Sequence, residues 1–209
     1  MEKRNKNLLM KASIIFLVGA ALVKFFPTSG DLNELKKPDY LSKVNQAKSF
    51  AVKSGLDTTI CFLADMSVHM GKKRLVVYDF QKDSILREMI VTHGSAGSKG
   101  LKSSGPDEPV FSNIPGSYAS SLGKYKIGKR SYSNWGINIH YKLHGLESTN
   151  NNAFKRIIVL HSYINVDKEE VFPDYPPYSL GCPMVSNEDM RYLDDLLKKK
   201  KDVLLWMYN

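Results

Sequence analysis

The sequence predicts a mainly β domain, a sandwich or barrel, with an amphipathic helix before it and a single helix late in the chain. Short apolar stretches recur from residue 58 onward, separated by Gly, Pro, Asn and Lys-Asp pairs. Helical spacing of apolar residues is confined to one segment before residue 58 and one near residue 190. With 209 residues, 43% of them hydrophobic, the chain is long enough for one good core.

The first 26 residues have the pattern of a signal peptide or an N-terminal membrane anchor. A basic start precedes an apolar run over residues 12–23, and Lys24 and the turn-forming residues 27–30 follow it. The run has twelve residues, fewer than the roughly 20 that a membrane-spanning helix needs, and this length is typical of a signal-peptide core. No sharp cleavage motif follows, so a cleaved signal and an uncleaved anchor both stay open. Either predicts export to the periplasm or cell envelope, with inner-membrane anchoring in the second case.

Residues 27–57 are predicted to form a helical spacer. Apolar residues recur every three or four positions between residues 38 and 54, which indicates an amphipathic helix, and Gly55 ends it. This helix would either pack on the following domain or separate it from the membrane.

Residues 58–209 are predicted to form the main domain. Strands are expected at residues 58–65, 74–80, 85–92, 124–128, 136–143, 156–162 and 203–208. One helix interrupts them, because Ser186 with Asp189 resembles a helix cap and apolar residues follow at helical spacing. Its apolar face comprises Met190, Leu193, Leu196 and Leu197.

The net charge of +9 limits the choice of partners. The first 24 residues contain five basic residues and one acidic residue, so the main domain has only a modest positive excess. That excess suits an anionic cell envelope, and no nucleic-acid-binding motif accompanies it. The lysine run at 198–201 is expected to be a solvated helix end that the helix dipole favours.

The chain has two cysteines in contrasting contexts. Cys61 lies in an apolar, strand-like run and is expected to be a small buried hydrophobe. Cys182 follows Gly181, and His161 lies twenty-one residues before it. A disulfide between the two cysteines is not favoured, because a single bridge is a thin framework for a chain of this length.

Cys182, His161 and Gly181 together form the minimum set for acyl transfer. A thiolate is the reactive form of cysteine, and a nearby imidazole can take the thiol proton. Gly181 lets the backbone approach a substrate carbonyl, so the amides of residues 180–182 could face an oxyanion. From these residues alone, a buried structural cysteine remains the alternative.

Several motifs along the chain resemble, in order, those of the L,D-transpeptidase catalytic domain, a family of cysteine enzymes that remodel peptidoglycan. The resemblance runs from about Thr59 to Asn209. The matching segments are residues 91–95, 112–117, 120–123, 143–147, 152–153, 156–162 and 179–183.

The resemblance implies roles for four residues. Cys182 would be the nucleophile, His161 the general base and Ser162 the residue whose carbonyl orients the imidazole, with Gly181 beside the nucleophile. The reaction would join peptidoglycan stem peptides through a Cys182 thioester. An L,D-carboxypeptidase with the same residues and a non-catalytic peptidoglycan-binding module remain alternatives, and the oligomeric state is open.

The chain departs from the family pattern at two positions. Many members carry a histidine where this chain has Leu180, and a common asparagine is replaced by Met184. The first departure removes a polar neighbour of the nucleophile, so it bears on substrate preference more than on the chemistry.

Six residues are predicted to contact the substrate. They are Ser179, Leu180, His144, Ser120, Ser121 and His93. No cofactor or metal is expected: His140 and His144 alternate with apolar residues at strand spacing, and a metal site would need a third ligand. His69 carries no signature and is expected at the surface.

Two loops stand out in the predicted main domain. The long segment between His93 and Pro115 is rich in Gly, Ser and Lys, and loops of this length usually bind, gate or stay disordered. Residues 172–178 contain three prolines and are expected to form a stiff lid beside the nucleophile.

Overall fold

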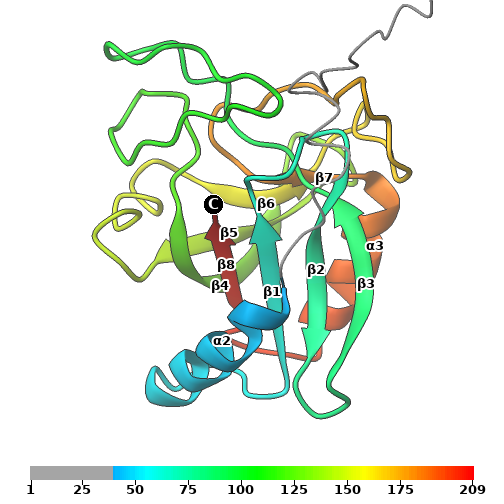
Figure 1. The fold of residues 1–209 in the computed structure, drawn as a ribbon. Coiled ribbons are helices and arrows are strands. Elements are labelled where there is room, and N and C mark those ends of the chain that lie inside the picture. The colour runs from blue at the N-terminus through cyan, green and yellow to red at the C-terminus, as the bar shows by residue number, and fades with distance from the viewer. Residues whose placement is uncertain (1–39) are drawn as a thin grey trace, which may run out of the picture.

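A computed structural model describes residues 40–209 of the protein. The predicted leader at residues 1–26 and the first part of the spacer lie outside the described residues. Eight strands form one sheet in the order β3-β2-β1-β8-β4-β5-β6-β7, which curls into a nearly closed barrel (Figure 1). The elements are α2 (Leu41–Lys53), β1 (Ile60–Asp65), β2 (Lys73–Asp79), β3 (Ser84–Ile90), β4 (Gly123–Tyr132), β5 (Ile139–Gly145), β6 (Val159–Ser162), β7 (Met184–Val185), α3 (Asn187–Leu197) and β8 (Leu204–Tyr208).

The last strand joins the two halves of the sheet. Strand β8 lies between β1, to which it is parallel, and β4, to which it is antiparallel. On one side β1, β2 and β3 form an antiparallel meander, and on the other β4, β5 and β6 do the same before β7 adds in parallel. The predicted mainly β class with one helix before the strands and one late in the chain is confirmed.

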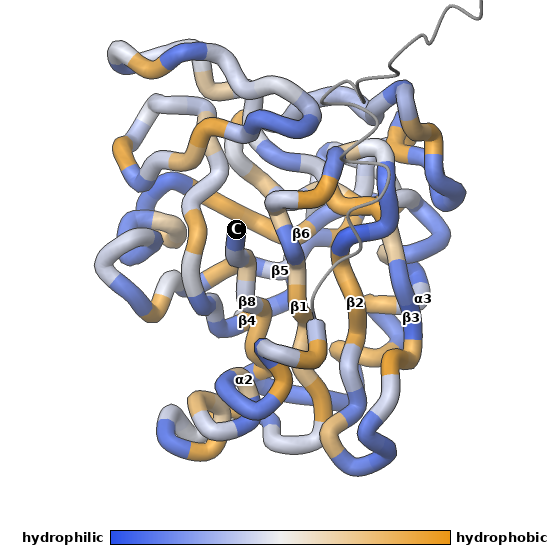
Figure 2. The backbone as a smooth tube through the Cα atoms, in the orientation of Figure 1, coloured by the Kyte–Doolittle hydropathy of each residue, from blue (hydrophilic) through white to orange (hydrophobic). Residues whose placement is uncertain are grey.

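The sheet is buried on both faces along its centre, which explains the continuous apolar run of β1. Phe62 and Ala64 face the main core, whereas Cys61 and Leu63 face a second core under α2. Helix α2 packs on this second core through its buried residues Val44, Ala47 and Ala51. Figure 2 shows hydrophobic colour along β1 and β2 and hydrophilic colour at the tip of the hairpin that follows β2.

Helix α3 begins as the sequence predicts. The Ser186 hydroxyl accepts a hydrogen bond from the Asp189 backbone N–H at 3.0 Å, and it donates one to the Asp189 carboxylate at 2.7 Å. Met190 and Leu193 lie fully buried in the main core. Within residues 40–209, no helix combines the length and the apolar character needed to cross a bilayer.

Some predicted boundaries differ from the structure. Strand β5 starts three residues later than expected because Gly136 and Asn138 adopt positive φ angles of 58° and 61° in a turn. Strand β7 has only two residues, too few for an alternating pattern to reveal it.

His69, expected at the surface, is 4% exposed, and its Nδ1 accepts a hydrogen bond from the Gly71 N–H at 3.0 Å.

Candidate active site

Cys182 and His161 line one pocket of about 410 Å³. Its wall includes Trp, Tyr and His side chains and comes from the β4–β5 turn, the end of β6 with the residue after it, and the segment that leads into β7. The remaining lining residues are Trp135, Tyr163, Pro177, Tyr178, Ser179, Leu180 and Met184. The long sequence interval between His161 and Cys182 therefore closes into a single concave site, the type of place where ligands bind.

Strand pairing brings the candidate base His161 and the segment that carries Cys182 together. His161 is the third residue of β6, and its register partner in β7 is Met184, two residues after Cys182. The backbone of the same segment is fixed again by Thr92, whose N–H donates to the Met184 carbonyl at 2.9 Å. The position of Cys182 is thus set by main-chain bonds on both sides.

The hydrogen bond of His161 determines which ring nitrogen is available. Its Nδ1 lies 3.0 Å from the carbonyl oxygen of Ser162. A carbonyl can only accept, so Nδ1 carries the hydrogen and Nε2 keeps its lone pair. This is the contact that the resemblance implies for Ser162, and it leaves His161 in the tautomer that a general base requires.

The His161 imidazole is neutral at neutral pH. Burial lowers its pKa, the bond to Ser162 opposes this, and the positive charge that nearby His140 can acquire lowers it further. His140 is the register partner of His161 across β5 and β6. Within the described residues, the Nε2 atom of His140 is buried and has no hydrogen-bond partner.

The Cys182 thiol is half-buried and touches the start of β6 and the chain just before it. Its Sγ accepts a hydrogen bond from the Val159 N–H at 3.5 Å, and the thiol donates one to the Ile157 carbonyl oxygen at 3.8 Å. Burial raises the pKa of the thiol, while the Val159 N–H and the charge of Arg156 lower it. Both shifts favour the uncharged forms, a thiol at Cys182 and a neutral imidazole at His161.

Arg156 is a functional candidate that the sequence reasoning missed. Its guanidinium donates to the carbonyl oxygens of Ser112 at 2.8 Å and Ala119 at 2.5 Å, which fixes it beside the nucleophile. A Cβ placed on Gly181 would lie 3.2 Å from its Nη2 atom. The only sequence signal was its place at the start of the matching segment 156–162.

Gly181 is required by both conformation and space. Its φ of +115° disfavours any other residue, and a Cβ would meet the Ala119 carbonyl at 2.9 Å. Its N–H donates to the Ser179 hydroxyl at 3.1 Å. The Gly181 N–H is thereby occupied, which leaves the N–H groups of Leu180 and Cys182 as the candidates to face an oxyanion.

Ser120 and Ser121, predicted as substrate anchors, are buried and are not among the residues that line this pocket. The Ser120 hydroxyl accepts from the Gly94 N–H and donates to the Gly181 carbonyl, both at 3.0 Å. The Ser121 hydroxyl bonds to that of Tyr125 at 2.8 Å. Ser120 instead holds the backbone behind the nucleophile in place.

His93 is also behind the site, not in it. It is 1% exposed; its Nδ1 accepts from Arg74 at 2.8 Å, and its Nε2 hydrogen donates to the Gly105 carbonyl at 3.1 Å. Burial and the charge of Arg74 lower its pKa to about 3, so it stays neutral. Its backbone carbonyl accepts a hydrogen bond from the Ser179 N–H at 3.0 Å, and this bond holds the segment that leads to Cys182.

Of the remaining predicted contacts, two reach the pocket and one does not. Ser179 and Leu180 line it, and the Leu180 side chain is 68% exposed at its edge. His144 lines a different hollow at the other end of β5. No group of three or more His, Cys, Asp or Glu residues within residues 40–209 is placed to hold a metal ion.

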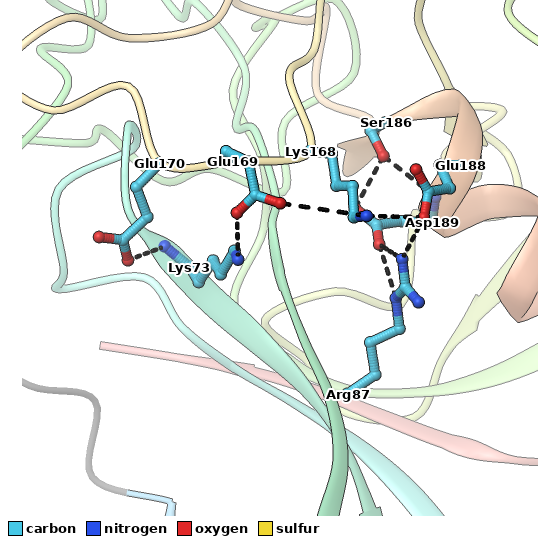
Figure 3. A network of polar contacts seen from close by, with 8 residues as sticks. All are labelled: Lys73, Arg87, Lys168, Glu169, Glu170, Ser186, Glu188 and Asp189. Carbon is cyan, nitrogen blue, oxygen red and sulfur yellow. Dashed lines mark hydrogen bonds and ion pairs between the residues drawn. The ribbon is translucent and has the colours of Figure 1, made fainter.

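A network of charged residues ties the segment before the predicted lid to the rest of the domain (Figure 3). Lys73 on β2 binds Glu169 through its Nζ at 2.8 Å and Glu170 through its backbone N–H at 2.9 Å. Lys168 pairs with Glu188 of α3 at 2.9 Å. Each exposed pair stabilises little, but together they fix the course of the segment that leads to Cys182.

A family model described as the L,D-transpeptidase catalytic domain matches residues 32–208. The chain belongs to this family. This match confirms the resemblance found in the motifs, and it extends upstream to include α2. No curated protein matches the chain at a significant level.

Several solved structures are similar to this L,D-transpeptidase-family chain. The helical cell shape determining protein Pgp2 from Campylobacter jejuni has 14% identity and a TM-score of 0.45, with 78% of this chain and 55% of that chain covered. Bd1075 from Bdellovibrio bacteriovorus has 17% identity and a TM-score of 0.44, with 72% and 48% covered. An L,D-transpeptidase from Mycobacterium smegmatis has 12% identity and a TM-score of 0.43, with 72% and 59% covered. The chain thus spans about half the length of these proteins.

Proposed function

We propose that the protein is an exported cysteine acyltransferase that joins peptidoglycan stem peptides by L,D-transpeptidation. The L,D-transpeptidase family acts on these peptides. The observation that carries the proposal is the His161 to Ser162 hydrogen bond, because it leaves an unprotonated Nε2 in the same pocket as the Cys182 thiol. Export rests on the leader pattern of residues 1–26.

The first half-reaction forms a thioester. The thiol proton moves to His161 Nε2, and the Cys182 sulfur attacks the diaminopimelate carbonyl carbon that is bonded to the terminal D-alanine. The Cys182 N–H faces the oxyanion that develops. When the C–N bond breaks, the imidazolium returns the proton to the leaving nitrogen, and D-alanine departs.

The second half-reaction releases the enzyme. An amine of another stem peptide attacks the thioester carbonyl and gives its proton to His161. The C–S bond breaks, the sulfur recovers a proton and a new amide crosslink results. If water attacks instead, the product is a shortened stem with a free carboxylate, which is L,D-carboxypeptidase activity by the same residues.

Muropeptide digestion tests this proposal. The folded domain is incubated with disaccharide tetrapeptides, and the products are identified by mass spectrometry, with Cys182→Ala as the control. Crosslinked dimers with release of D-alanine support transpeptidation, and tripeptides without dimers support the carboxypeptidase alternative. If the wild type forms neither product but binds the muropeptides, the protein is a non-catalytic peptidoglycan-binding module.

A further inference from the structure

A hollow of about 560 Å³ lies at the His144 end of β5. The opposite end of this strand carries His140, the register partner of His161. The hollow is bordered by β4, β5 and the connection from α3 to β8. Six of its lining residues are Lys or Arg, and the only acidic one is Asp202. The basic residues are Lys126, Lys129, Arg130, Lys198, Lys200 and Lys201. We call this site the basic hollow.

Part of this charge is neutralised and part is not. Arg130 and Lys198 share the Asp194 carboxylate at 2.6 and 2.7 Å, and Lys126 lies 3.5 Å from Asp202. Lys198 also lies 3.5 Å from Asp195, and Lys200 donates to the Thr59 hydroxyl at 2.6 Å. By contrast, Lys129, Lys200 and Lys201 take part in no ion pair within residues 40–209, because the Thr59 hydroxyl that Lys200 contacts is neutral. Concentrating unpaired like charges in one concavity favours an anionic ligand.

His144 is held in the basic hollow by its neighbours. Its ring stacks on Phe154 with a centroid separation of 4.9 Å and an interplanar angle of 18°. A Cβ on Gly128 would lie 2.4 Å from its Nε2 atom, so the glycine makes room for the imidazole. Burial and the charges of Lys126 and Lys142 lower its pKa, which keeps a neutral hydrogen-bonding group among the cations.

One strand connects the basic hollow to the catalytic pocket. His140 of β5 is the register partner of His161, whereas His144, four residues along, is the register partner of Lys126. Alternate residues of a strand share a face, and four residues rise about 13 Å. An extended peptide covers about 3.3 Å per residue, so about four extended residues equal the rise between His140 and His144.

We propose that the basic hollow binds carboxylates of a peptidoglycan stem peptide and holds the polymer beside the catalytic pocket. This proposal rests on the proposed function, because it assumes that peptidoglycan is the substrate. It gives His144 a substrate contact about 13 Å along β5 from His140, the register partner of His161, instead of in the catalytic cleft. Stem peptides bear free carboxylates, whose charge the unpaired lysines complement.

Sedimentation with purified, insoluble peptidoglycan tests the basic hollow. The Cys182→Ala background prevents turnover, and Lys129→Gln with Lys201→Gln removes two of the three unpaired charges and leaves the Lys200 contact with Thr59 intact. The expected result is a three- to tenfold weaker affinity, with less dependence on salt. Lys48→Gln with Lys82→Gln, a pair of exposed lysines elsewhere, is the charge-matched control and should bind as the parent does.

Two further arms identify the anion. Coupling the peptidoglycan carboxylates to a neutral amine with carbodiimide should lower parent binding to the level of the double variant, whereas phosphate groups would survive this treatment. Unchanged binding after coupling, or equal binding of parent and double variant, overturns the proposal. The proposal is also overturned if the double variant keeps its binding to peptidoglycan and loses binding only to vesicles of phosphatidylglycerol and phosphatidylcholine.

The proposed function is checked separately in the same variants. With Cys182 restored, acylation of the thiol by a carbapenem should proceed at the parent rate in the Lys129→Gln and Lys201→Gln double variant. If acylation fails in every protein but sedimentation responds as expected, the catalytic proposal fails and the basic hollow stands.

Discussion

The two thiols of this domain lie in opposite surroundings. Cys61 is 0% exposed in the centre of β1, and burial alone raises its pKa far above the ordinary range. Burial also raises the pKa of Cys182, but there the Val159 N–H and the charge of Arg156 oppose the rise. The surroundings make the difference: Cys182 has a backbone donor, a nearby cation and a pocket, whereas Cys61 is packed inside the hydrophobic cluster under α2.

The histidines show the same contrast. His93 is held by bonds on both nitrogens and stays neutral, so it can only support the fold. His161 has a bond on Nδ1 and leaves Nε2 to the pocket. We infer that reactivity depends on whether the fold leaves a ring nitrogen or a thiol open to the pocket. Mutations of one cysteine or one histidine at a time test this.

The largest effect is expected from exchanging the two cysteines for alanine. Cys182→Ala should abolish turnover, a loss of about 10³-fold or more, because the nucleophile is gone. Cys61→Ala should leave turnover unchanged and lower the free energy of unfolding by about 1–2 kcal/mol, because it leaves a small cavity. Muropeptide turnover and urea unfolding measure the two effects. Loss of turnover in Cys61→Ala with an intact fold would break the comparison.

His161→Gln should lower the rate of acylation by about 10²- to 10⁴-fold. The lowered pKa of His161 means that the base form prevails at neutral pH, so wild-type acylation should fall as the pH drops through a pKa below 6.5. In the variant that limb should vanish, and the rate should climb with pH toward the raised pKa of the thiol. Acylation rates between pH 4 and 10 measure this. A variant that keeps the acidic limb would assign the base to another residue.

Arg156→Gln should lower the reactivity of Cys182 at neutral pH by roughly three- to tenfold, because a neighbouring positive charge stabilises the thiolate. Arg156→Lys keeps the charge and should recover part of the loss. The pH dependence of iodoacetamide labelling measures both. If Gln and Lys variants are equally slow at every pH, Arg156 acts through its hydrogen bonds to the Ser112 and Ala119 carbonyls and not through its charge.

Ser120→Ala should have the smallest effect on turnover, a few-fold loss. The substitution removes the link between the Gly94 N–H and the Gly181 carbonyl and leaves two buried polar groups without their partner. The Michaelis constant should change little, because the side chain does not reach the pocket. A selective rise in that constant would restore Ser120 as a substrate anchor.

The sequence predicted most of the fold because strand and helix periods depend on local pattern. The cap at Ser186 and the buried faces of β1 follow from that pattern alone. Strand β7 was not predicted because two residues cannot show an alternating pattern. The start of β5 was predicted too early because Asn138 has a positive φ, which ends the extended conformation there.

The candidate site was less accessible to sequence reasoning. Motifs identified Cys182 and His161, but motif membership does not show which side chains face a pocket. Ser120 and His93 match the motifs because they support the nucleophile segment from behind. Arg156 binds carbonyls about forty residues away in the chain, a contact that no local pattern reveals.

Acylation by a carbapenem, read by intact-protein mass spectrometry, tests the central claim most directly. The family resemblance implies that the strained lactam carbonyl takes the place of the stem carbonyl, so the reaction needs the thiol, the base and the Cys182 N–H together. The account predicts one adduct on Cys182, absent in Cys182→Ala and slowed in His161→Gln. An adduct on Cys61, or none in reduced, folded protein that still binds peptidoglycan, would contradict it.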